Sequence, residues 1–304
     1  MDPNALLRRE VLAGGVAAAA VPTRGVPAPA AGPLTAGAVI ERMQQRIGVP
    51  WNGWGVDGFK AGAPETVVRG IGTTMMATFD ALKSAARQGL NMVITHEPTY
   101  WSHPDTLTDL QHDPLYLKKL AFLRAHNMVS FHFHDNWHAL KPVDGIDYGT
   151  QQLMGWTTYM HADDQRLFTL PPTTLGALAA DFQQKTGART IRVVGEPALP
   201  IRTVYESWGY CSAFPGISFL DKADVLVIGE AQDWDLIAYA QDLVALGEKK
   251  GLIVLGHVKS EQWGMRYCAD WLKRFVSEVP VRFVPIIEPY WNLDHLILEI
   301  ETEV

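Results

Sequence analysis

Residues of the kind that bind metal ions lie directly after short apolar stretches of the sequence. They fall at three places along the chain, and the candidate ligands are His96, Glu97, Asp135, His257 and Glu261, with His134 as the alternative to Asp135. Imidazole and carboxylate groups together form the ligand set expected for Zn, Mn or non-haem Fe rather than for Ca or Mg. The residue types therefore predict a site for divalent metal ions.

A single histidine after a strand is more often a hydrogen-bonded structural residue than a ligand. The metal prediction depends on three such places recurring within one structural pattern. The histidines outside that pattern are assigned to the surface or the core by default, and they are His103, His112, His126, His138, His161 and His295.

Hydrophobic periodicity predicts strands that alternate with helices. Strands are predicted at residues 67–73, 92–95, 128–133, 190–194, 203–208, 223–228, 252–255 and 281–285. Helices are predicted at residues 35–47, 77–88, 114–127, 175–185, 234–246 and 260–276. This alternation favours an α/β fold with a mostly parallel sheet covered by helices. Because strand ends converge at one edge of such a sheet, the candidate ligands are expected to meet there.

The pair His257 and Glu261 is expected to act together. His257 leaves the predicted strand 252–255, and Glu261 follows four residues later in the first turn of the next helix. An imidazole and a carboxylate placed in this way can face one ion. The alternative is a hydrogen-bonded pair beside a helix N-terminus.

The chain is long enough for one large domain or two smaller lobes. Residues 34–162 form a first α/β portion with metal ligands, and residues 211–304 form a closing α/β portion with the remaining ligands. Residues 163–210 contain several prolines and are predicted to be an inserted or second lobe.

The N-terminus differs in composition from the rest of the chain. Arg8 and Arg9 precede an Ala/Gly-rich apolar stretch at residues 11–21, Arg24 follows it, and small residues at 28–30 offer a cleavage site. The stretch is too short to be a stable membrane anchor. The pattern resembles a twin-arginine signal peptide over residues 1–30, which predicts export to the periplasm or the exterior. The alternative is an ordinary amphipathic or disordered N-terminus.

Charge and cysteine content exclude several classes of protein. The formal net charge is −7 and the chain has no long cluster of Lys and Arg, so nucleic acid is not an expected partner. Cys211 and Cys268 are too few for a disulfide scaffold and belong to no CxxC motif.

Three segments of the sequence resemble the Nif-three-like (GTP cyclohydrolase I type 2-like) family. Residues 89–98 are similar to its strand and His-His-Pro turn, residues 223–230 to its "ADVLVTGE" strand, and residues 255–261 to its closing "GH…E" turn. The resemblance implies two α/β lobes with mostly parallel sheets that face a cleft holding two adjacent metal ions. It also implies a homo-oligomer, commonly a ring-shaped hexamer.

The sequence departs from this family pattern at two positions. Glu97 stands where the family has its second histidine. The family also has an aspartate four residues after a histidine, whereas here Asp135 follows His132 by three and Asn136 takes the fourth position. Asp135 is the preferred bridging carboxylate, with His134 as its substitute.

Two adjacent divalent ions, whether Zn, Mn or Fe, would supply hydrolytic chemistry. The leading prediction is therefore a metal-dependent hydrolase of a small molecule, with the substrate left open. A non-catalytic metal-binding or regulatory protein is the alternative. A third reading is a sugar- or aromatic-binding module formed by tryptophans near the motifs, which are Trp101, Trp137, Trp234 and Trp263.

Overall fold

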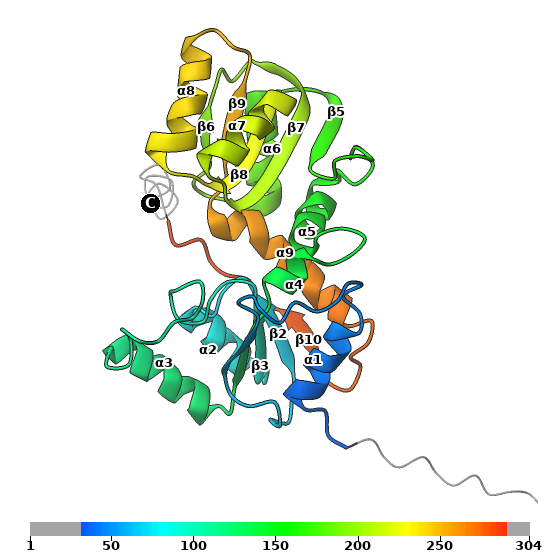
Figure 1. Ribbon diagram of the computed structural model, residues 1–304, viewed down its shortest axis with the longest axis vertical. Coiled ribbons are helices and arrows are strands. Elements are labelled where there is room, and N and C mark those ends of the chain that lie inside the picture. Colours follow the sequence, from blue (N-terminus) through cyan, green and yellow to red (C-terminus); the bar gives the residue numbers. More distant parts are fainter. Residues whose placement is uncertain (1–31, 291–304) are drawn as a thin grey trace, which may run out of the picture. The chain divides into compact units, whose positions relative to one another are not determined.

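Two five-stranded sheets form the framework of the protein in a computed structural model that describes residues 32–290 (Figure 1). The predicted signal peptide, residues 1–30, lies outside the described residues. From Pro33 onward the described chain belongs to one compact unit. Within residues 32–290, no helix is long and apolar enough to cross a membrane.

The first sheet is parallel except at one edge. Its strands, in spatial order, are β1 (Gly58–Ala61), β4 (Val129–His132), β3 (Met92–Thr95), β2 (Ile71–Thr74) and β10 (Val281–Phe283). Only β1 runs antiparallel to its neighbour. The strands β2, β3 and β4 are buried throughout, as expected for central strands covered on both faces.

The second sheet is mixed. Its strands, in spatial order, are β5 (Leu167–Thr174), β7 (Pro200–Tyr210), β8 (Val225–Glu230), β9 (Gly251–Val254) and β6 (Arg192–Val194). Both edge strands are antiparallel to their neighbours, and the two inner pairings are parallel. The second sheet thus extends beyond the 163–210 segment predicted as an inserted lobe.

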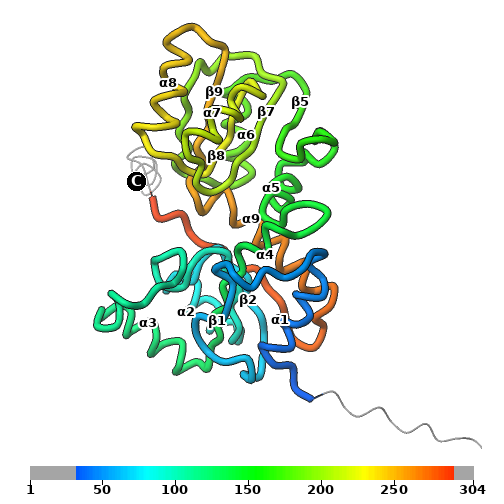
Figure 2. The backbone as a smooth tube through the Cα atoms, in the orientation of Figure 1, coloured from blue at the N-terminus to red at the C-terminus, as the bar shows by residue number. Residues whose placement is uncertain are grey.

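Helices connect and cover these strands. They are α1 (Ala36–Gln44), α2 (Phe79–Arg87), α3 (Pro114–Ala125), α4 (Asp135–His138), α5 (Gly145–Met154), α6 (Leu175–Thr186), α7 (Ala213–Lys222), the π-helix η1 (Asp233–Ile237), α8 (Ala238–Ala245) and α9 (His257–Leu272). Figure 2 shows the chain leaving the first sheet after α4, forming the second sheet and returning through α9 to β10. Helix α9 contacts β2 and β10 of the first sheet and β7 and β8 of the second.

Helix starts follow the local sequence. The Thr35 hydroxyl accepts a hydrogen bond from the Ala38 N–H at 3.2 Å and caps α1, at the start of the helix predicted over residues 35–47. Asp113 caps α3, whose first residue is Pro114. These starts need only residues within one turn, which is why the sequence predicts them well.

The α/β fold class with two sheets is confirmed, and several elements differ from the prediction. Helix α9 begins at His257 rather than at residue 260, so His257 and Glu261 lie one turn apart on the same helix. The prediction lacked β1, α4, α5, β5 and α7. Strand β5 contains Pro171 and Pro172, which disfavour a central strand; an edge strand with a register shift accommodates them.

Close packing of α5 against α9 explains two glycines in those helices. A Cβ at Gly149 would lie 2.4 Å from the Trp263 carbonyl oxygen and 2.5 Å from the Gly264 Cα. A Cβ at Gly264 would lie 2.5 Å from the Ile146 Cα. Only residues without a Cβ allow this approach, which fixes the position of α9 between the sheets.

Candidate metal centre

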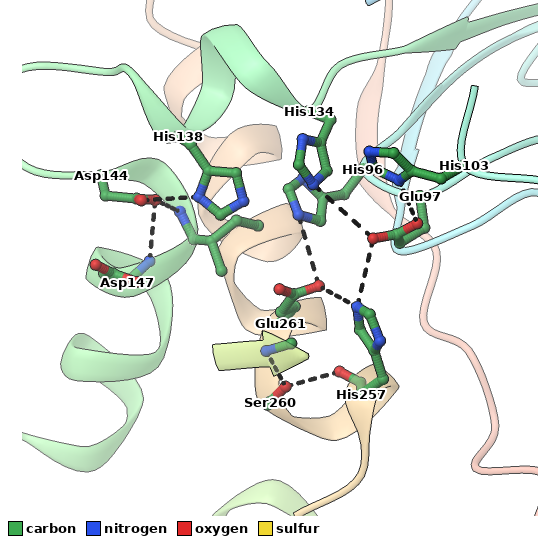
Figure 3. A network of polar contacts seen from close by, with 12 residues as sticks. His96, Glu97, His103, His134, His138, Asp144, Asp147, His257, Ser260 and Glu261 are labelled. Carbon is green, nitrogen blue, oxygen red and sulfur yellow. Dashed lines mark hydrogen bonds and ion pairs between the residues drawn. The ribbon is translucent and has the colours of Figure 1, made fainter. Parts of the chain in front are cut away.

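The ends of β3 and β4 and the first turns of α9 bring a group of histidines and glutamates together (Figure 3). Because β3 and β4 are parallel neighbours, the residues after them lie side by side. The group consists of His96 and Glu97 after β3, His134 and His138 at α4, and His257 and Glu261 on α9.

The short helix α4 is held in place by Asp57, which precedes β1. The Asp57 carboxylate accepts hydrogen bonds from the N–H groups of His134 at 2.7 Å, Asp135 at 2.9 Å and Asn136 at 3.1 Å. This satisfies the free donors at the start of the helix. It also fixes the direction in which His134 and His138 leave the backbone.

His96 lies at the buried centre of the group. Its side chain is fully buried, and neither ring nitrogen has a hydrogen-bond partner among residues 32–290. Its Nε2 lies 3.5 Å from Glu261 Oε2. Burial, together with the nearby imidazoles of His138 and His134, holds the pKa of His96 well below its usual range. His96 is therefore a neutral imidazole with a free lone pair, as metal coordination requires.

Glu97 contacts both a histidine at the end of β4 and a histidine on α9. Its Oε1 lies 3.3 Å from His257 Nε2 and 3.9 Å from His134 Nε2. Burial raises the pKa of Glu97, but the hydrogen bond from His257 and the neighbouring imidazoles outweigh burial and lower the pKa to about 2. Glu97 is thus an ionised carboxylate at the opening of the group.

Carboxylates orient both His257 and His138. His257 Nδ1 lies 3.0 Å from Glu230 Oε1, while its Nε2 lies 3.1 Å from Glu261 Oε2. Burial lowers the pKa of His257, but these carboxylates and Glu97 raise it overall, to about 12. A histidine with one nitrogen held by a carboxylate presents the other in a fixed direction, an arrangement common among metal ligands.

His138 has a similar partner in Asp144, whose Oδ2 lies 2.8 Å from His138 Nδ1. Burial lowers the pKa of His138, but Asp144 and other nearby carboxylates raise it to about 9. Behind Asp144, Arg166 donates to Asp144 at 3.4 Å and to Asp147 at 2.8 Å. The guanidinium thereby fixes the carboxylate that orients the imidazole.

In the part of the chain that the structure describes, three overlapping sets of ligand atoms are compact enough to hold a metal ion. In each set all ligand atoms lie within 4.8 Å of one another, and the sets are His96, His134 and His138; Glu97, His103 and His134; and His96, Glu97 and Glu261. The unpartnered nitrogens of the buried His96 ring provide an independent sign of fit, because buried polar atoms normally have partners. The donor set suits Zn, Mn or Fe.

Asp135, predicted as the bridging carboxylate, has other contacts. Its Oδ1 lies 2.9 Å from His134 Nδ1, and its Oδ2 accepts the Val56 N–H at 3.0 Å. It belongs to none of the three compact sets. His134 and His138 occupy the places nearest the other ligands, so Asp135 orients His134.

His138 and His103 were predicted to be surface or core residues, but both lie beside His134. The family spacing could have found His138. Counted from His134 instead of His132, the fourth following residue is His138, in the place of the family's aspartate. His103 lies in a loop, and no spacing rule points to it.

A cavity of about 730 Å³ adjoins Glu97 and His257. Its lining comes from segments near both sheets and includes Met76, Trp101, Thr190, Arg192, Glu230, Lys259 and Tyr290. Of the four tryptophans considered above, only Trp101 lines this cavity. Trp137 is fully buried, while Trp234 is 77% exposed.

A two-sheet α/β fold with candidate metal-binding groups at the strand ends defines the class of this protein. Its sequence matches the Duf34/NIF3 (NGG1p interacting factor 3) family over residues 40–289, and the chain belongs to that family. The resemblance seen in the sequence is thereby confirmed. No protein of curated function matches the chain at a significant level.

Solved structures support the same fold. Hypothetical protein SA1388 of Staphylococcus aureus has a TM-score of 0.69 at 17% identity, covering 86% of this chain and 100% of that one. A Bacillus cereus protein related to NIF3 has a TM-score of 0.66 at 14% identity, covering 86% and 99%. Reduced HcgD of Methanocaldococcus jannaschii has a TM-score of 0.62 at 15% identity, covering 83% and 98%.

Proposed function

We propose that the protein binds two divalent metal ions, Zn, Mn or Fe, and hydrolyses a small molecule at that centre. The observation that carries the proposal is the fully buried His96, whose two ring nitrogens lack hydrogen-bond partners beside Glu261. The proposed ligands are His96, Glu97, His134, His138, His257 and Glu261. Bound divalent ions would act as Lewis acids and would lower the pKa of water toward neutrality.

The protein's own residues prepare this chemistry. Glu230 and Asp144 hold His257 and His138 in fixed orientations, so these imidazoles need no rearrangement to bind. Burial around His96 excludes competing water. The site is therefore preorganised by Glu230 at the end of β8 and by Asp144 before α5.

The adjoining cavity favours catalysis over a purely structural centre. Its volume of about 730 Å³ lies within the range of small-molecule pockets. Because Glu97 and His257 line it, a bound substrate would lie next to the centre. Structural metal sites are usually closed by protein ligands, so a cavity that reaches Glu97 and His257 favours a catalytic centre over a structural one.

The test is metal analysis followed by a substrate screen. Purified wild type is expected to contain two ions per chain, and His96→Ala is expected to lose at least one. His112→Ala is the matched control, since His112 is an exposed histidine remote in sequence from every proposed ligand. If wild type hydrolyses a phosphate or carboxylic ester and His96→Ala does not, the result supports the proposed hydrolase function. Full metal content without any activity would favour the non-catalytic alternative.

We also propose export and self-association. Replacing Arg8 and Arg9 by lysine is expected to retain the protein in the cytoplasm, because twin-arginine signals require the arginine pair. Cell fractionation checks this, and unchanged export would disprove it. Light scattering is expected to show an oligomer, with a hexamer as the size that the family resemblance implies; a monomer at micromolar concentration would disprove it.

A further inference from the structure

The loop after Glu97 brings a further histidine to the centre. His103 Nδ1 lies 3.5 Å from Glu97 Oε2, and its ring lies 4.7 Å from the ring of His134. Ligand atoms of the three residues lie within 4.8 Å of one another. Figure 3 shows His103 beside Glu97, on the other side of His134 from His138.

Two residues of this loop adopt a backbone conformation that side chains disfavour. Trp101 has φ 60° and Asp105 has φ 56°, and they flank His103 on either side. A left-handed conformation is unfavourable for any residue with a Cβ and uncommon for a bulky one. Such conformations persist only where surrounding contacts impose them, and they concentrate at functional sites.

Buried polar groups impose this shape on the loop. The Asp105 carboxylate, whose side chain is 1% exposed, accepts the N–H groups of Thr99 at 3.2 Å and Tyr100 at 2.6 Å. The buried Lys119 ammonium donates to the Thr99 carbonyl and lies 4.9 Å from the Trp101 ring centroid. The base of the loop is therefore fixed, and the imidazole is held at its tip.

We propose that His103, Glu97 and His134 bind a metal ion as an outer site, separate from the buried ligands His96 and Glu261. This inference rests on the proposed function, because it assigns one of the two proposed ions. Two imidazoles and one carboxylate leave coordination positions open for substrate, and they suit Zn, Mn or non-haem Fe. The His103 side chain is 49% exposed, whereas that of His96 is fully buried, so the outer ion exchanges with solution more readily.

A surface ion pair between His103 and Glu97 is the simpler explanation of their contact. It accounts for the 3.5 Å distance between His103 and Glu97 but not for the third group, because His134 Nε2 also lies 3.9 Å from Glu97 Oε1. The outer site accounts for both contacts, because one ion bound between the three residues would be ligated by His103, Glu97 and His134, whose ligand atoms lie within 4.8 Å of one another.

The test is calorimetric titration of chelator-stripped protein with Zn²⁺ and with Mn²⁺. Wild type and the control His112→Ala are expected to show two binding steps of different affinity. His103→Ala is expected to keep the tighter step and to weaken the other by about 10-fold or more. Two unchanged steps in His103→Ala would overturn the outer site while leaving the proposed centre intact. Absence of any binding in wild type would overturn both.

Imidazole rescue distinguishes a ligand from a residue that shapes the loop. His103→Gly is expected to lose the weaker step and to recover it when millimolar imidazole is added, because free imidazole fills the space of the missing ring. Recovery supports direct coordination. If the variant keeps the circular dichroism spectrum of wild type but imidazole restores nothing, the outer site is wrong.

Discussion

The two sheets contribute to the centre in different ways. The central strands of the first sheet are parallel, so the residues after β3 and β4 lie together, and they supply most of the proposed ligands. The second sheet is mixed; its strand β8 ends at Glu230, which orients His257 instead of joining a compact ligand set. The first sheet thus supplies four of the six proposed ligands, whereas the second sheet contributes Glu230, which orients His257 and lines the cavity.

Helix α9 contacts both sheets and carries two of the proposed ligands. Replacing these ligands should have the largest effect on metal content. Glu261→Gln keeps the shape of the side chain but removes the charged oxygen that lies 3.1 Å from His257 Nε2. We expect loss of at least one metal ion per chain, and the same for His257→Ala. Native mass spectrometry checks this. Full occupancy in both variants would leave His257 and Glu261 as a hydrogen-bonded pair worth about 1–2 kcal/mol of stability.

A substitution at the contact between α5 and α9 tests whether the stability of the protein depends on the close packing of these two helices. In Gly149→Ala the new methyl group would lie 2.4 Å from the Trp263 carbonyl oxygen, which cannot move without shifting α9. We expect a loss of roughly 3 kcal/mol in the free energy of unfolding. Gly53→Ala is the control, because nothing lies within 4 Å of its new Cβ. Equal stability of the two variants in urea denaturation would show that α9 adjusts freely.

Glu230 tests the orienting role of the second sheet. Glu230→Gln removes the carboxylate that lies 3.0 Å from His257 Nδ1 but leaves every proposed ligand in place. We expect metal affinity to fall by about 10–100-fold, as is typical when the partner of a ligand is removed. Competition with a chromogenic chelator measures this affinity. An affinity equal to that of wild type would mean that the second sheet only lines the cavity.

The smallest expected effect concerns Lys119, which supports the loop of the first region. Burial lowers the pKa of Lys119 from 10.5 to about 8. Between these two values the unfolded chain binds more protons than the folded chain, so stability rises with pH across pH 8 to 10.5. Lys119→Met is expected to flatten this rise relative to Lys118→Met, its exposed neighbour. Thermal unfolding at several pH values compares the two, and parallel pH profiles would contradict the assignment.

Features that depend on neighbouring residues followed from the sequence. Strand β3 begins and ends at Met92 and Thr95 as predicted, and α3 begins at Pro114. His96 and Glu97 were correctly placed at a strand end because an apolar run and the polar residues after it are adjacent in the chain. Parallel pairing then brings such strand ends together.

Features that depend on distant partners were decided by the tertiary structure. The structure brings His134 and His138 rather than Asp135 into compact ligand sets, and α4 is held there by Asp57, which lies 78 residues before Asp135. His103 lies 3.5 Å from Glu97 in a loop whose base is held by buried Asp105 and Lys119. The sequence therefore determined which chemical groups the protein carries and where strands end. Long-range hydrogen bonds and packing decided which of those groups meet, because their energies depend on residues far apart in the chain.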